Sequence, residues 1–325
     1  MQAQLAGPFA VGTFSRPDGV QFPGLVVSGR VLDISGVLGD GRSRNTRTLL
    51  ENWDEALPVL HRLAAEPGQP WQPITGLHTH APVEPRQILQ SGANYRQHVI
   101  DLVVAHRRPD DPRTEEQARN EAAAMMDRRA AEDQPYMFIG LPSSITGPYD
   151  DVILPAWCEK PDWELELTAV IGRPAYRVSP EEALEHVAAY TIANDLTARE
   201  LIFRKDMPEI GTDWLRSKNA PGFTPLGPYL VPAAFVADPS GLQVTLKLNG
   251  ETMQDESTKD MIFDVARMVS YASQTTTLLP GDLVLTGSPA GNGMHWGRLL
   301  RDGDVMDGTV TGLGAQRTRC IAEQR

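Results

Sequence analysis

One stretch in the middle of the chain, DWELELTAVIG at residues 162–172, restricts the fold more than any other. Side chains alternate between the two faces of a β-strand, so Asp162, Glu164 and Glu166 would share one face and the apolar residues between them the other. Acidic residues are poor strand formers, and like charges on one face repel each other. The segment therefore predicts a strand with one face in an apolar core and an acidic face that meets either water or a cation.

The charge of the whole chain is compatible with a cation site. The 325 residues include 30 Lys and Arg against 42 Asp and Glu, a formal net charge of −12. Nucleic acids and anionic membranes are bound mainly through Lys and Arg, so we expect neither as a partner. No apolar run approaches the roughly 20 residues that cross a bilayer. The first residues also lack the pattern of a secretory signal, and we therefore expect a cytoplasmic protein.

The pattern along the chain predicts a small N-terminal α/β domain at residues 1–80 and a catalytic domain at 81–325. Short β-like runs and a helix from Trp53 to Ala65 precede a Pro-rich stretch at 66–87, which is typical of a linker. Residues 99–135 include a segment rich in Ala, Glu and Arg, which we interpret as a charged helical insertion. It would be a solvated surface helix, a lid or a dimer arm.

The rest of the chain predicts more strands than helices. Ser179 and Glu182 form a capping box with Pro180 between them, which predicts a helix start. The Asn249-Gly250 pair predicts a hairpin between two strands. Helical spacing occurs once more, in residues 260–273. This distribution favours a mixed, β-rich α+β fold over a doubly wound sheet.

Residues 88–325 resemble the fumarylacetoacetate hydrolase superfamily, in the branch of acylpyruvate hydrolases and 2-hydroxyhepta-2,4-diene-1,7-dioate isomerases. The resemblance implies a mixed β-sandwich roll of that family's C-terminal type with a small N-terminal domain, and it implies a homodimer. The matching motifs follow the family's order: Asn94-Tyr95-x-x-His98-x-x-Asp101, Glu164-x-Glu166, Asp195, Lys218, Pro225-Leu226-Gly227-Pro228, Asn249 to Gln254, Pro280-Gly281-Asp282 and Thr286-Gly287-Ser288-Pro289.

The resemblance also implies a site for one divalent cation, held by Glu164, Glu166 and Asp195. Three carboxylates without Cys or His suit a hard ion, and Mg²⁺, Mn²⁺ and Ca²⁺ are the candidates. An octahedral ion would keep about three positions for water or a chelating keto acid. Lys218 would neutralise the charge that three carboxylates leave on a dication.

The catalytic roles that the resemblance implies fall mainly on His98, Asp101 and Lys218. His98 would activate water as a general base, and Asp101 one helical turn away would orient its imidazole. Lys218 and the hydroxyl or backbone of Ser288 would stabilise an oxyanion. The implied substrate contacts are Tyr95, Arg199 and Ser288.

Three departures from the family's pattern affect substrate recognition more than the metal site. Asp101 stands where a Glu is usual, so the partner of His98 is one methylene shorter. Lys218 is followed by Asn219-Ala220-Pro221 instead of Gly-Phe-Asp, and Ile202 stands where a substrate-contacting Gln is frequent.

The sequence leaves three functions open. The first is a metal-dependent hydrolase that cleaves a C–C bond in a diketone or acylpyruvate-like compound. The second is a decarboxylase or isomerase (tautomerase) of a keto acid, which needs enolate stabilisation without water delivery. The third is a non-catalytic protein that keeps the metal site. The chain lacks a GxSxG elbow, which argues against a serine hydrolase. His78 and His80 would share a strand face, and we interpret them as structural rather than metal-binding.

Overall fold

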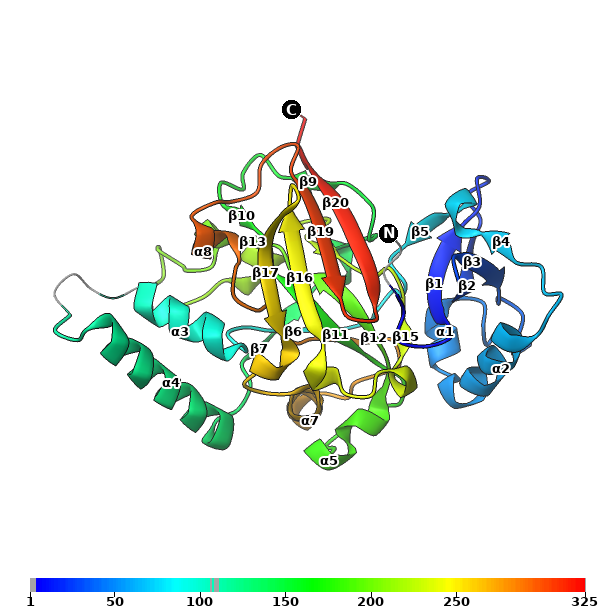
Figure 1. The fold of residues 1–325 in the computed structure, drawn as a ribbon, viewed down its shortest axis with the longest axis horizontal. Coiled ribbons are helices and arrows are strands. Elements are labelled where there is room, and N and C mark those ends of the chain that lie inside the picture. The colour runs from blue at the N-terminus through cyan, green and yellow to red at the C-terminus, as the bar shows by residue number, and fades with distance from the viewer. Residues whose placement is uncertain (1–3, 106, 108–110, 325) are drawn as a thin grey trace.

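The computed structural model describes residues 4–105, 107 and 111–324. Figure 1 shows a β-rich body, a smaller unit made by the N-terminal part of the chain on one side, and a pair of helices that projects on the other side. Among the described residues, no helix is long and apolar enough to cross a membrane.

The N-terminal unit is a five-stranded antiparallel sheet of order β4-β3-β2-β1-β5. Its strands are β1 (Ala10–Ser15), β2 (Gln21–Val27), β3 (Arg30–Asp33), β4 (Gln72–Pro73) and β5 (His78–His80). Helices α1 (Thr46–Leu50) and α2 (Trp53–Ala65) bury Leu50 and Leu60 against it, and the predicted helix at Trp53 to Ala65 is confirmed.

The linker interpretation of residues 66–87 is wrong in part. Within this stretch β4 pairs with β3, and β5 pairs with β1. His80 lies on β5, where its Nε2 contacts Ser15 Oγ at 2.8 Å. Strands of two and three residues are too short to show an alternating pattern among so many Pro and Gly residues.

Two larger sheets form the β-rich body. The first has the order β15-β12-β11-β18-β6-β7, antiparallel except where β18 and β6 run parallel. Its strands are β6 (Ile88–Ser91), β7 (Met137–Gly140), β11 (Leu165–Ile171), β12 (Val187–Asn194), β15 (Val231–Pro232) and β18 (Leu283–Leu285). The second has the order β17-β16-β19-β20-β9, with strands β9 (Val152–Leu154), β16 (Gln243–Leu248), β17 (Glu251–Ser257), β19 (Val305–Val310) and β20 (Gly314–Ala322).

The apolar core lies between these two sheets. Leu165 and Leu167 of β11 are fully buried and belong to one cluster with Leu246 of β16 and Met306 of β19. The sheets approach so closely that a Cβ added at Gly308 would lie 2.6 Å from the Leu165 side chain. This arrangement confirms the β-rich, mixed α+β fold with an additional N-terminal sheet.

Short elements complete the body. The two-stranded pairs are β10 (Pro161–Asp162) with β13 (Thr197–Ala198), and β8 (Ile145–Thr146) with β14 (Thr224–Pro225). The helices are α5 (Pro180–Ala183), α6 (Trp214–Lys218), α7 (Val265–Thr275) and α8 (Gly293–Trp296). The predicted hairpin is confirmed, since Asn249 and Gly250 have φ of 53° and 87° between β16 and β17. The predicted capping box at Ser179 is also present, although α5 continues only as a 3₁₀ turn, Leu184–His186.

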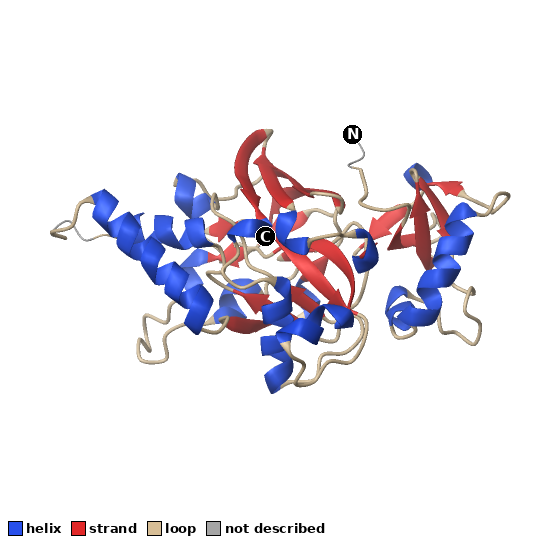
Figure 2. Ribbon diagram, turned by 60° about the horizontal axis from the view of Figure 1, so that its bottom comes forward, coloured by secondary structure: helices blue, strands red, loops and turns tan. Residues whose placement is uncertain are grey.

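The projecting helices are α3 (Arg96–Ala105) and α4 (Glu115–Glu132), which lie side by side in Figures 1 and 2. Thr114 caps α4, whose buried face consists of Ala118, Ala122 and Met126. Arg96 pairs with Asp127 at 3.1 Å across the two helices. The charged segment is therefore helical over α3 and α4, and residues 111–114 and 133–135 are not helical; its residues 106 and 108–110 lie outside the described part.

Candidate metal centre and active site

The two faces of β11 have different surroundings, and both are buried. Leu165 and Leu167 face the sandwich core, whereas Glu166 and Thr168 point to the opposite face, where both are fully buried. Glu164, just before β11, is 13% exposed, so the acidic side is largely buried and a fully solvated acidic face, one of the two alternatives that the sequence left open, is ruled out. Asp162 lies apart, on β10, where its carboxylate accepts bonds from Arg199 Nε at 2.7 Å and from the Gly293 backbone N–H at 2.5 Å.

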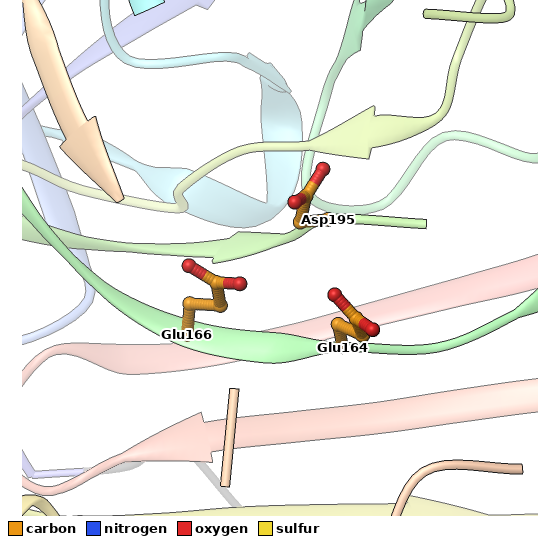
Figure 3. A group of neighbouring side chains, drawn as sticks. All are labelled: Glu164, Glu166 and Asp195. Atoms are coloured by element: carbon orange, nitrogen blue, oxygen red, sulfur yellow. The ribbon is translucent and has the colours of Figure 1, made fainter. Parts of the chain in front are cut away.

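Antiparallel pairing brings Asp195 to the two glutamates. Leu165 of β11 is opposite Asn194 of β12, and the next residue, Asp195, donates its backbone N–H to Glu164 O at 2.8 Å. Figure 3 shows the three carboxylates converging from the neighbouring segments. One carboxylate oxygen of each of Glu164, Glu166 and Asp195 lies within 4.8 Å of those of the others. The structure therefore assembles the three predicted metal ligands.

The contacts of these carboxylates differ, and one buried oxygen stays without a partner among the described residues. Glu166 Oε2 accepts the backbone N–H of Gly287 at 2.8 Å, but the buried Glu166 Oε1 has no hydrogen-bond partner within residues 4–105, 107 and 111–324. Gly287 has φ of 87°, and a Cβ there would lie 3.0 Å from that of Asn94, so this approach favours glycine. Gln90 Nε2 donates to Asp195 Oδ1 at 2.5 Å. An all-oxygen donor set with an unpartnered buried oxygen fits a hard divalent cation.

Lys218, at the end of α6, lies directly against two of the ligands. Its ammonium donates to Glu164 Oε2 at 2.7 Å, to Asp195 Oδ2 at 2.6 Å and to the Asp195 backbone carbonyl at 2.9 Å. Only 2% of its side chain is exposed. These three bonds engage all three N–H groups of the ammonium. In this arrangement Lys218 supplies positive charge to the cluster and has no free donor.

The pKa values show that the cluster lacks positive charge. Burial raises the pKa of Glu166 well above its usual range, and the charge of Asp195 raises it further. Burial also raises the pKa of Asp195 to about 6, although Lys218 opposes the change. At Glu164 burial is outweighed by Arg199 and Lys218, which lower the pKa to about 2. A divalent ion would supply the charge that lets all three carboxylates ionise together.

Arg199, predicted as a substrate contact, is held by acids. Its Nε donates to Asp162 at 2.7 Å and its Nη2 to Glu164 Oε1 at 2.5 Å, and its side chain is 15% exposed. The structure thus places Arg199 where it orients Glu164. Its contact with substrate stays a prediction.

The segment that carries the predicted base is fixed by Asn94. The Asn94 amide donates to the backbone carbonyls of Phe263 and Thr286 at 2.9 and 2.8 Å and accepts the Phe263 N–H at 2.9 Å. The next residue, Tyr95, is fully buried, and its hydroxyl has no hydrogen-bond partner in the part of the chain that the structure describes. Asn94 therefore ties the segment before α3 to Phe263 and to Thr286, which directly precedes Gly287, the residue that bonds Glu166.

His98 and Asp101 both lie on α3. Burial lowers the pKa of His98, and Glu164 opposes this effect. Asp101 Oδ1 accepts bonds from Gln97 and Arg119, each at 2.9 Å. Within the described residues no hydrogen bond joins His98 to Asp101, so the structure brings the predicted pair onto one helix without connecting it directly.

Gln254 connects Ser288 to the strand that carries the metal ligand Glu166. The Gln254 amide donates to Ser288 Oγ at 2.8 Å and accepts the Leu165 N–H at 3.1 Å, which ties the Ser288 loop to β11. Sequence reasoning missed Asp162 and Gln90 as neighbours of the site. Asp162 could have been predicted as a neighbour, because it belongs to the acidic row of residues 162–166. Gln90 could not, because its contact with Asp195 depends on where β6 lies in the sheet.

Residues 87–321 match the family model described as fumarylacetoacetate (FAA) hydrolase C-terminal. The chain is 34% identical over 270 residues to the mitochondrial oxaloacetate tautomerase FAHD2B of Homo sapiens. The matched region covers 82% of this chain and 76% of that protein. It is 42% identical over 195 residues to the 2,4-didehydro-3-deoxy-L-rhamnonate hydrolase of Sphingomonas sp. (strain SKA58), covering 59% and 66%.

A solved structure, the fumarylacetoacetate hydrolase of the psychrophilic Exiguobacterium antarcticum, is 29% identical and superimposes with a TM-score of 0.75, covering 97% of this chain and all of that one. The relatives include enzymes named as a tautomerase and as a hydrolase. With the matched family model and the acidic metal site together, the chain belongs to the fumarylacetoacetate hydrolase family.

Proposed function

We propose that this protein is a divalent-metal-dependent hydrolase that cleaves a C–C bond in a diketone or acylpyruvate-like substrate, with Mg²⁺ or Mn²⁺ as its ion. The observation that carries the proposal is the buried cluster of Glu164, Glu166 and Asp195 with an unpartnered oxygen. When bound, the ion supplies Lewis-acid polarisation of a chelating 2-oxo acid. The remaining chemistry falls to side chains of the chain itself.

His98 is suited to the role of general base. Burial lowers its pKa, Glu164 opposes the change and Arg199 adds to it, with a net lowering. A neutral imidazole can accept a proton from the water that adds to the acyl carbonyl carbon. The bond from that carbon to the neighbouring methylene then breaks. The acyl part leaves as a carboxylic acid, and the methylene carbon takes up a proton to give pyruvate.

The oxyanion formed by water addition needs hydrogen-bond donors. All three N–H groups of Lys218 are engaged with acids and a backbone carbonyl, so this residue contributes charge. The Ser288 hydroxyl donates only a long bond of 3.3 Å to the Pro289 carbonyl, and the Tyr95 hydroxyl has no partner. These two hydroxyls are therefore the donors that the substrate would engage.

Replacement of His98 by Ala tests the proposal. We expect loss of acetylpyruvate hydrolysis while the bound Mn²⁺, measured by elemental analysis, stays at the level of the parent protein. His186→Ala, at a half-buried histidine of the Leu184–His186 turn, is the matched control and should keep both activity and metal. Unchanged hydrolysis by His98→Ala would contradict the proposed base.

The second candidate is a keto-acid tautomerase or decarboxylase, which needs no activated water. Two observations favour it: the similarity to a protein named as an oxaloacetate tautomerase, and the bonds of Asp101 to Gln97 and Arg119 instead of His98. If oxaloacetate is enolised or decarboxylated at the same rate by His98→Ala, while the parent protein cleaves no acylpyruvate, this candidate replaces the hydrolase. Inactivity towards every keto acid would favour the third hypothesis, a non-catalytic protein that keeps the metal site.

A further inference from the structure

Three aromatic side chains form a wall beside the metal centre: Tyr136, Phe138 and Trp214. The Phe138 and Trp214 rings are stacked with centroids 4.5 Å apart and planes 15° from parallel. Tyr136 lies 6.2 Å from Trp214 between ring centroids, and its hydroxyl accepts the Trp214 indole N–H at 2.6 Å. Tyr136 is 45% exposed, and the other two are half-buried. We call these residues the aromatic wall.

The pairing of the first large sheet puts the aromatic wall on the metal-binding face. Phe138 of β7 is directly opposite Gln90 of β6, and directly opposed residues point to the same side of a sheet. Gln90 reaches Asp195 on that side. Tyr136 directly precedes β7, and its ring lies beside that of Phe138, with centroids 6.3 Å apart. The aromatic wall therefore borders the same space as the carboxylates.

Helix α6 connects the aromatic wall to the metal ligands a second time. Trp214 and Lys218 are four residues apart on it and share one side of the helix. The Lys218 ammonium, which bonds Glu164 and Asp195, lies 5.9 Å from the centre of the Phe138 ring. The helix is also fastened to the end of β7, because Asn219 Oδ1 accepts the Leu141 N–H at 2.6 Å.

Two cations near the aromatic wall are already paired, and Arg216 of α6, two residues after Trp214, lies on a different side of the helix from Trp214 and Lys218. Lys218 is bonded to two carboxylates, and Arg204, beside the start of α6, pairs with Asp206 at 2.7 Å and with Asp213 at 3.4 Å. A second carboxylate of a substrate at this position would contact the aromatic rings. Neither Lys218 nor Arg204 would be free to form an ion pair with it. Rings that stay partly exposed and are fixed by a hydrogen bond suit a flat or apolar group instead.

We infer that the aromatic wall receives the acyl substituent of the substrate and that this substituent is aromatic or apolar, as in an aroylpyruvate. The inference rests on the proposed function for the position of the pyruvoyl end, which the metal centre would hold. It assigns substrate selection to Phe138 and Trp214, which touch the substituent at the end of the substrate that does not chelate the metal.

Binding of two non-cleavable acids tests the inference without turnover. Calorimetry with Mn²⁺ present would compare phenylpyruvate with pyruvate. We expect phenylpyruvate to bind about tenfold more tightly to the parent protein, the size of effect that ring stacking gives. Trp214→Leu and Phe138→Leu should remove most of this preference and leave pyruvate binding within about twofold. Tyr176→Leu changes an exposed tyrosine outside the aromatic wall and should leave the affinities for both phenylpyruvate and pyruvate unchanged.

Activity gives a second readout. Both leucine variants should lose about tenfold in kcat/KM for benzoylpyruvate and considerably less for acetylpyruvate, whose acyl substituent is only a methyl group. Absence of all hydrolysis would count against the proposed function, while the binding preference would still decide the role of the aromatic wall. Equal binding of the two acids, or a preference that both variants retain, would overturn the inference. The inference would also be overturned if light scattering showed that the variants dissociate while the preference for phenylpyruvate stays intact. The aromatic wall would then be a contact with a second copy of the chain.

Discussion

Replacement of Glu166 by Gln should leave the stability of the metal-free protein nearly unchanged and remove most of the stabilisation that a bound metal ion provides. Glu166 is fully buried, with Oε2 bonded to the Gly287 N–H and Oε1 unpartnered. The Gln side chain has the same shape, can keep the Gly287 bond through its carbonyl, and places an NH₂ group near the Glu164 and Asp195 carboxylates. Without metal we therefore expect a change in the free energy of unfolding of no more than about 1 kcal/mol.

With metal the same substitution should be costly. Mutations of groups that only orient ligands reduce metal affinity about 10- to 100-fold, so loss of a carboxylate ligand should cost at least about 100-fold. At a Mn²⁺ concentration 100 times the Kd, the ion stabilises the parent protein by about 2.7 kcal/mol. At that concentration a site weakened 100-fold would retain only about 0.4 kcal/mol. The difference, about 2.3 kcal/mol, is readily measurable.

Urea unfolding followed by far-UV circular dichroism, with and without Mn²⁺, would measure both quantities, and calorimetry would give the Kd directly. Glu185→Gln removes the same charge at an exposed position of the Leu184–His186 turn and should respond to Mn²⁺ as the parent protein does. Equal stabilisation of Glu166→Gln and parent by Mn²⁺ would refute the assignment of Glu166 as a ligand.

Three further predictions concern the surroundings of the site. Lys218→Met leaves Glu164 and Asp195 buried without their cation and should lower the metal-free stability by roughly 3–5 kcal/mol in urea unfolding; an unchanged midpoint would contradict the charge balance described above. Light scattering should give twice the chain mass of 35.6 kDa, as expected for a homodimer, and a value near one chain mass would exclude it. Hydrogen exchange across residues 99–135 should slow when Mn²⁺ and oxalate bind, as expected for a lid; equal, strong protection in both states would identify a fixed arm.

The metal ligands were assigned from the family resemblance, and strand alternation supports two of them. Glu164 and Glu166 are two residues apart in extended backbone, which places them on one side, although β11 itself begins at Leu165. Asp195 was assigned by family resemblance, and the structure shows the physical reason: it directly follows β12, whose pairing with β11 sets Asp195 against Glu164. Register between strands is not visible in one sequence, which is also why Gln90 was missed.

The partners of polar side chains were harder to predict than their identity. Arg199 follows the Asp195 motif in sequence, yet its position is decided by Asp162 on β10, which pairs with the strand β13 that directly precedes Arg199. Asp101 lies one turn from His98 but bonds to Arg119, which α4 brings close. Such choices depend on how helices and loops pack. The domain boundary after residue 80 and the cytoplasmic location stay predictions.

Helix α6 has a consequence for how this enzyme could diversify. Its five residues carry both Trp214 of the aromatic wall and Lys218 of the metal centre. A change that tilts or shifts this helix to admit a different acyl group would also displace the ammonium from Glu164 and Asp195. New substrate range acquired through α6 should therefore come with altered metal affinity. Tyr136, which lies outside α6 and bonds to it through Trp214, offers a route with a weaker linkage to the metal centre than Phe138, whose ring lies 5.9 Å from the Lys218 ammonium.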